Sequence, residues 1–183
     1  MSGVSGNLEQ LLHSNKLDMA LLFQPEPQGL QVEWLFQEAL YLVAPPSLAV
    51  PDPFPLARTA DTLMLLPSPN LGLRTLIDSA LARHGIRPNI VAELDGSIPT
   101  LCTAIEHGLG CSIMPWAAFS DSAARGEVAG YPLTPEMWRP VSLCRSAAPA
   151  ASRASQVVFE RMRRLIREDL RHAVEIGSIR LQS

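Results

Sequence analysis

One stretch of the chain, from Glu93 to Trp116, constrains the fold more than any other. An acidic strand end leads into a helix that starts with serine and proline. A turn with glycines at 108 and 110 follows, and then an apolar strand that stops at a proline. Glycine commonly ends a helix, and two short apolar runs flank this one. The stretch therefore predicts a strand–helix–strand unit whose helix has a polar N-terminus.

The same alternation extends along the rest of the chain. A short buried strand is predicted at 63–66, a helix over 71–84 that ends at Gly85, and a strand at 89–94. The helix 98–107 and the strand 111–114 follow. Strands that alternate with helices of this length indicate parallel βαβ units and an α/β fold. The other predicted elements are helices at 5–14 and 152–170 and strands at 17–23, 30–36, 39–43, 128–133 and 140–144.

Two predicted helices have a clear apolar stripe. In the helix 71–84 the stripe comprises Leu73, Leu76, Ile77, Ala80 and Leu81. In the helix 152–170 we place Val158, Met162, Leu165, Ile166 and Asp169 along one side. Such a stripe faces the core of a globular protein.

Five prolines between residues 45 and 55 exclude a regular helix there. We interpret this crossing as the passage between two lobes. The first lobe then comprises residues 1–45 and 140–171, and the second comprises residues 46–139. Residues 172–183 form a C-terminal tail without strong periodicity, for which we predict poor order.

Composition excludes several classes of protein. The chain has 183 residues and a net charge of −3, which argues against holding nucleic acid by its own charge. No apolar run reaches the roughly 18 residues of a membrane span, and the first ten residues lack the pattern of a secretory signal. Three cysteines, Cys102, Cys111 and Cys144, lack the spacing of a disulfide framework. We expect a cytoplasmic protein without membrane contact.

Two predicted helix starts are candidates for a binding site. They lie at Ser68-Pro69-Asn70 and at Ser97-Ile98-Pro99-Thr100. Both follow predicted strands, so both are expected at the carboxyl edge of a parallel sheet, where open α/β folds bind ligands. Free N–H groups and the positive end of the helix dipole suit a carboxylate or another small anion. Plain helix capping explains the same residues, since serine and proline are favoured there anyway.

Catalysis and metal binding find little support. Cys102, His107 and Cys111 straddle a helix and a strand without a CxxC pair, and core packing explains Cys102 better than zinc does. No serine elbow or glycine-rich phosphate loop is present, and the four histidines lie near predicted helix ends. The arginines of the last helix are interleaved with acids, so we interpret them as a solvated face. We predict no enzyme activity, no catalytic residue, no metal and no cofactor.

Four short motifs in order point to a family. They are LDMA at 17–20, Glu38 to Pro46 (EALYLVAPP), residues 100–115 (TLCTAIEHGLGCSIMP) and RPVSL at 139–143. Over about residues 3–170 the chain resembles the effector-binding domain of LysR-type transcriptional regulators. The residues of the first two motifs are most similar to those of the nitrogen-assimilation-control branch of this family.

The resemblance implies a two-lobed type II periplasmic-binding-protein-like fold that senses a small polar or anionic metabolite. By position, the effector-binding residues would be Ser68, Asn70, Ser97, Thr100 and Met114. Closure of the lobes on the ligand would rearrange a homodimer or tetramer and so control transcription. A solute-binding protein of a transport system shares the fold but needs an export signal. A small hydrolase or lyase needs a polar catalytic pair.

The resemblance also implies that parts of the family pattern lie outside this sequence. The helix-turn-helix, the linker helix and the first strand of the effector domain have no counterpart, so the first lobe is incomplete at its N-terminus. The chain would then be a fragment, a shortened gene model or a regulator that has lost its DNA-binding domain. Contact with DNA would be made only through the absent helix-turn-helix. We expect five apolar side chains to lack their usual cover: Leu21, Phe23, Val158, Leu165 and Ile166.

Overall fold

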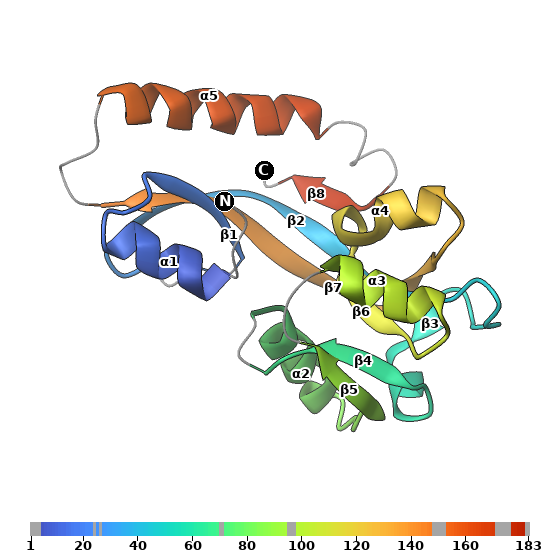
Figure 1. Ribbon diagram of the computed structural model, residues 1–183. Helices are drawn as coiled ribbons and strands as arrows, with labels where there is room; N and C mark the ends of the chain where they lie inside the picture. Colours follow the sequence, from blue (N-terminus) through green and yellow to red (C-terminus); the bar gives the residue numbers. More distant parts are fainter. Residues whose placement is uncertain are drawn as a thin grey trace. The chain divides into compact units, whose positions relative to one another are not determined.

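The computed structural model describes residues 5–23, 25, 27–69, 72–94, 98–147, 153–170 and 177–181 (Figure 1). The chain divides into two compact units. Unit 1 comprises Met1–Glu38 and Arg139–Ser183, and unit 2 comprises Ala39–Trp138. The lobes proposed above, 1–45 with 140–171 and 46–139, remain a prediction.

Unit 1 is built on antiparallel strands. Helix α1 (Ser5–His13) precedes β1 (Met19–Phe23), and β1 pairs with the last part of β7 (Ala129–Ser146), from Met19 opposite Arg145 to Phe23 opposite Val141. β7 lies between β1 and β2 (Leu30–Ala44) in the sheet order. Helix α5 (Arg153–Asp169) and strand β8 (Ile179–Leu181) complete the unit, with β8 paired to β2 at Phe36–Glu38.

Both long strands are longer than predicted. The segments expected at 30–36 and 39–43 form the single strand β2, because Gln37 and Glu38 contain no turn signal. The segments expected at 128–133 and 140–144 likewise belong to one strand, β7, despite three prolines. Proline removes a hydrogen-bond donor and is tolerated in a strand where that donor is not needed. β7 changes partners along its length, from β3 (Phe54–Pro55) at Leu133 to β1 at Val141.

Unit 2 contains the predicted parallel units. β4 (Met64–Pro67) and β5 (Ile90–Leu94) are parallel neighbours, and helix α2 (Gly72–Arg83) connects them. Helix α3 (Ile98–Glu106) leads from β5 to β6 (Ser112–Pro115), and a parallel bridge joins Met64 to Cys111 just before β6. β6 also pairs antiparallel with β2. The prediction of a βαβ arrangement is therefore confirmed.

Three elements of unit 2 escaped prediction. The short strand β3 lies in the proline-rich crossing, the 3-10 helix η1 (Leu56–Ala60) follows it, and helix α4 (Trp116–Ala124) starts directly after β6. Phe119 of α4 is buried in the core. A side chain at Gly130 would have its Cβ 2.5 Å from the Phe119 ring, so this close approach of β7 requires glycine.

The core of unit 2 consists of two apolar clusters. The first lies under α2 and contains the predicted stripe: Ile77, Ala80 and Leu81 are buried, with Leu73 and Leu76 packed against them. The second lies beneath α3 and α4. Its buried members are Val43, Leu65, Leu101, Cys102, Ile105, Met114, Phe119 and Val128.

The core of unit 1 is smaller, and the stripe predicted for α5 is partly wrong. Phe159 packs against Leu35 and Leu143, with Met162 and Ile166 beside it, whereas Val158 and Leu165 are exposed. Relative to the predicted stripe, the helix directs Phe159 and not Val158 toward the core, because the aromatic ring buries more apolar surface than valine does. The side chain of Asp169 lies outside the described residues.

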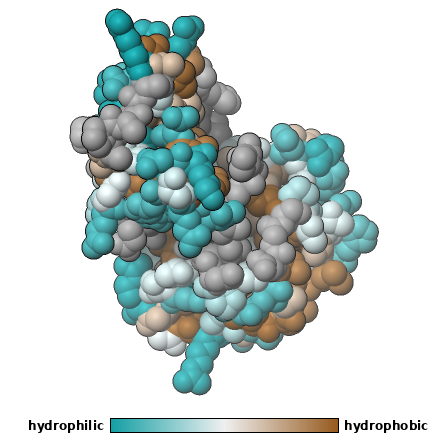
Figure 2. Space-filling view, turned by 60° about the vertical axis from the view of Figure 1, so that its left-hand side comes forward, coloured by the Kyte–Doolittle hydropathy of each residue, from teal (hydrophilic) through white to brown (hydrophobic). Residues whose placement is uncertain are grey.

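Other apolar side chains of unit 1 also reach the surface. On the face of the molecule that Figure 2 shows, hydrophobic residues (brown) lie among hydrophilic ones (teal). Leu21 and Trp34 are 38% and 46% exposed. Phe23 carries the Arg139 guanidinium on its ring, so it has a partner after all. The sequence predicts poor order for the tail at 172–183, but residues 177–181 form a turn and strand β8. Residues 172–176 and 182–183 lie outside the described residues. Within the described parts of the chain, no helix is long and apolar enough to cross a membrane.

Candidate functional site

The candidate site lies where β4 and β5 end. The two strands run parallel in a register that places Pro67 opposite Leu94, and the Ser68 N–H donates to the Leu94 carbonyl at 3.2 Å. The chain leaves both strands at the same sheet edge. This is the edge at which open α/β sheets bind ligands.

Helices start just beyond both strand ends. α2 begins at Gly72 and α3 at Ile98. The first N–H groups of a helix have no partner within the helix, and the helix dipole places partial positive charge there. Two such starts after neighbouring parallel strands make this edge of unit 2 favourable for negative charge.

The five predicted site residues have different surroundings. Ser68 is partly buried at the end of β4, and Thr100 is exposed in the first turn of α3, where it already has an interaction partner. Met114 is 1% exposed and packs in the core beneath α3 and α4. Asn70 and Ser97 lie outside the described residues. As effector contacts, all five remain a prediction.

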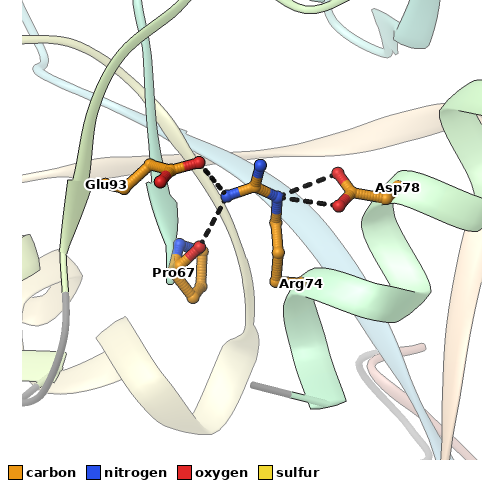
Figure 3. A network of polar contacts seen from close by, with 4 residues as sticks. All are labelled: Pro67, Arg74, Asp78 and Glu93. Carbon is orange, nitrogen blue, oxygen red and sulfur yellow. Dashed lines mark hydrogen bonds and ion pairs between the residues drawn. The ribbon is translucent and has the colours of Figure 1, made fainter. Parts of the chain in front are cut away.

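A buried arginine that the sequence interpretation missed joins the elements at this edge. Arg74 lies in the first turn of α2, and its side chain is only 8% exposed. Its Nη1 group donates to the Pro67 carbonyl at 2.9 Å and to Glu93 Oε1 at 2.8 Å (Figure 3). Its Nε group donates to both carboxylate oxygens of Asp78, at 2.9 and 3.0 Å. One guanidinium thus ties the end of β4 to β5 and to the next turn of α2.

The charge of this cluster is fixed. Burial lowers the pKa of Arg74, but the hydrogen bonds and charges of Glu93 and Asp78 outweigh it and raise the pKa above its ordinary value. The guanidinium is therefore a permanent cation next to two carboxylates that are 43% and 47% exposed. Since the formal charges sum to −1 when all three groups are ionised, any positive potential at this edge comes from the helix starts and not from Arg74.

A sequence signal for this cluster did exist. Arg74 lies three residues before Ile77 and seven before Leu81, so it belongs to the stripe that faces the core. A charged side chain on such a stripe needs a partner of opposite charge. Asp78 is at the i+4 position, and Glu93 is the next-to-last residue of the neighbouring strand.

The cysteines do not form a chemical site. All three thiols are buried and unpaired by disulfides. Burial raises the pKa of Cys111 to about 11, and burial with the Glu9 charge raises that of Cys144 to about 12, so both are protonated at neutral pH. Across the described residues, no group of three or more His, Cys, Asp or Glu side chains is arranged to hold a metal.

Comparison with known proteins identifies the class. Solved structures share the fold. One is the effector-binding domain of QuiR in complex with shikimate (TM-score 0.77, 24% identity); the match covers 88% of this chain and 77% of the QuiR chain. The regulatory domain of Synechocystis CcmR in complex with 2-PG (TM-score 0.80, 17% identity) covers 89% and 80%. The fold is thus that of the type II periplasmic-binding-protein-like regulatory domains.

The family follows from the sequence comparison. Residues 1–167 match the LysR substrate binding domain, and the chain belongs to this family as a LysR-type effector-binding domain. It is 31% identical over 155 residues to the uncharacterized HTH-type transcriptional regulator YfeR of Shigella flexneri. It is also 31% identical over 159 residues to the nitrogen assimilation regulatory protein nac of Klebsiella aerogenes. These matches cover 83% and 84% of this chain but 50% of each relative, so the chain spans about half their length.

Proposed function

We propose that the chain senses a small polar or anionic metabolite at the edge where β4 and β5 end. The observation that carries this proposal is the pairing of two helix starts at one sheet edge, with Pro67 in register with Leu94. Ser68 and Thr100 would donate to the ligand together with the helix N–H groups. Asn70, Ser97 and Met114 are proposed by family position.

The full regulator would couple this sensing to transcription. Ligand binding would favour one arrangement of a homodimer or tetramer over another, because a ligand shifts a conformational equilibrium only by its differential affinity. Closure of the two lobes would be the change that the ligand selects. In this proposal, DNA is bound by a helix-turn-helix of the full regulator and not by this chain. The regulator acts in the cytoplasm, where its target DNA lies. We propose no enzymatic activity for it.

Arg74 enters this proposal as a positioning residue. Its Nη1 and Nε groups donate to Pro67, Glu93 and Asp78, so its part would be to fix the strand ends from which both helix starts follow. A site held by buried hydrogen bonds is pre-organised, which lowers the cost of binding.

The test is a pair of alanine substitutions at the helix starts. A hydroxyl hydrogen bond to a charged ligand contributes roughly 1.5–3 kcal/mol, so Ser68→Ala with Thr100→Ala should weaken binding at least about tenfold. Ser97→Ala with Thr100→Ala should do the same at α3 alone. Calorimetry with the metabolite that binds best, starting from shikimate as a probe, measures this. Ser79→Ala, exposed near the end of α2, is the matched control, and an unchanged affinity in the site variants would move the site elsewhere.

A further inference from the structure

A cavity of about 380 Å³ lies within unit 2, away from the sheet edge discussed above. It is bordered by Pro45 and residues 47–51, which follow β2, by η1 and the residues after it up to Leu63, and by Gly108, Gly110 and Cys111. Leu63 directly precedes β4, and Cys111 directly precedes β6. The cavity therefore opens at the amino ends of these strands, whereas Ser68 and Thr100 lie beyond carboxyl ends.

One wall of the cavity is apolar. Val50, Pro51 and Phe54 contribute to it, and so do Leu48 and Leu63, which are 41% and 50% exposed to solvent. Gly110 has φ 158°, and a Cβ there would lie 2.8 Å from the Leu63 carbonyl oxygen, so only glycine allows this approach. Exposed leucines beside a hollow of this size are typical of a small-molecule pocket.

The other wall carries two opposite charges on one side of η1. Arg58 lies in η1, and Asp61 is its C-terminal cap, with the Asp61 N–H donating to the Arg58 carbonyl at 3.1 Å. In a 3-10 helix, side chains three residues apart project from the same side. Thr62 adds a hydroxyl that donates to the Arg58 carbonyl at 2.8 Å and keeps its lone pairs as acceptors. Among the described residues no ion pair joins Arg58 to Asp61.

We propose that this cavity binds a zwitterion with an aliphatic body, the chemistry of a small apolar α-amino acid. The ligand carboxylate accepts hydrogen bonds from the Arg58 guanidinium, a geometry that arginine provides in bidentate form. The ligand ammonium donates to Asp61 and to the Thr62 hydroxyl, and the aliphatic group packs on Leu48, Val50 and Leu63. The site is separate from the proposed effector residues, so either assignment can fail alone.

The experiment is an amide chemical-shift titration of the whole chain with three probes. L-Leucine carries both charges, 4-methylpentanoate lacks the ammonium, and 3-methylbutylamine lacks the carboxylate. We expect leucine to shift the amides of Thr62, Gly108 and Gly110 saturably and to bind at least about tenfold more tightly than either analogue. The amides of Ser68 and Thr100 should not move in this titration.

Two variants assign the charges. Arg58→Ala should weaken leucine at least about tenfold, and Asp61→Asn should weaken leucine but leave 4-methylpentanoate unchanged. Both positions are exposed, so the fold is retained, and Arg83→Ala is the matched control at an exposed arginine outside the cavity. The proposal is overturned if leucine gives no saturable shift up to its solubility, if the three probes bind equally, or if Arg58→Ala leaves leucine binding unchanged.

Discussion

Unit 1 and unit 2 differ in how much core supports them. Among the residues that the structure describes, the two clusters of unit 2 contain fourteen and eight buried apolar residues, and those of unit 1 contain four and three. Burial of apolar surface is the main favourable contribution to folding. Within this described part of the chain, unit 2 therefore has the larger apolar core.

The contrast extends to one buried arginine in each unit. Arg74 in unit 2 has two half-exposed carboxylates and a carbonyl, and its pKa is raised. Arg139 in unit 1 has the single carboxylate of Glu38 and the face of Phe23, 3.5 Å from the ring centroid. There burial outweighs the attraction of the partner, so the pKa of Arg139 is lowered and that of Glu38 is raised. The two arginines show that the cost of burying a guanidinium depends on how many acceptors it has and how well water reaches them. One close carboxylate alone does not offset that cost.

Hydrogen exchange should show the largest difference between the units. We expect strong protection across Leu63–Met114 in unit 2 and weak protection across Leu8–Phe36 and Val158–Leu170 in unit 1, by at least about a hundredfold. The physical reason is the thin core of unit 1 and the exposure of Val158 and Leu165. Uniform protection in a monomer would mean that unit 1 closes its own core fully.

Removing Arg139 should have the next largest effect. Arg139→Met leaves the Glu38 carboxylate, whose side chain is 9% exposed, without its cation. Breaking one side of a buried ion pair costs about 3–5 kcal/mol. Native-state hydrogen exchange of the β7 amides from Val141 to Arg145 measures this loss within unit 1.

The double variant Glu38→Gln with Arg139→Met is the control for this prediction. It removes both charges and should recover a large part of the loss, because the coupling is pairwise. A loss below about 1 kcal/mol in Arg139→Met would mean that solvent reaches the pair.

Removing Arg74 should cost less, because its carboxylates are half-exposed. Arg74→Met leaves the buried Pro67 carbonyl unpaired, and an unsatisfied buried group costs about 1–3 kcal/mol. The exchange of β4 and β5 amides reports on it, and Arg83→Met at an exposed site serves as the control, expected within about 0.5 kcal/mol. If Arg74→Met cost more than Arg139→Met, acceptor number and hydration would not explain the contrast between the two arginines.

A smaller effect concerns pH. Burial raises the pKa of Glu38 above its ordinary value of 4.5, although the charge and hydrogen bond of Arg139 act in the opposite direction. Between 4.5 and the folded-state pKa the folded protein binds the proton more tightly, so this group adds stability as pH falls and loses it as pH rises. The opening free energy of β2 in the wild type, minus that of Glu38→Gln, should therefore increase as the pH falls from 7 to 4.5. A difference that stays flat or decreases would contradict the raised pKa.

The sequence predicted the elements that have sharp boundaries. Gly85 and Gly108 end α2 and α3, and short apolar runs mark β4, β5 and β6, so the parallel arrangement followed from local signals. Helix α4 was missed because it starts at Trp116 without a spacer after Pro115. Which face of α5 packs on the core depends on the contact of Phe159 with Leu35, a residue far away in the sequence. The local sequence of the helix does not predict such a contact.

The site was predictable only in outline. The positions of Ser68 and Thr100 beyond strand ends followed from the alternation of elements. The burial of Met114 did not, because β6 is covered on both faces by residues distant in sequence. The Arg74 cluster needs the register of β4 against β5 to bring Glu93 to the guanidinium, and register is a property of the tertiary fold.

The central claim is that unit 2 binds an effector at the helix starts that follow β4 and β5. Its most direct test is an amide chemical-shift map of the whole chain with a panel of small carboxylates and phosphates, shikimate and inorganic phosphate among them. We expect at least one saturable ligand that shifts the amides of Ser68 and Thr100 together. The claim would be contradicted if every saturable ligand of the panel left both amides unmoved and shifted only other parts of the chain outside the cavity beside Arg58.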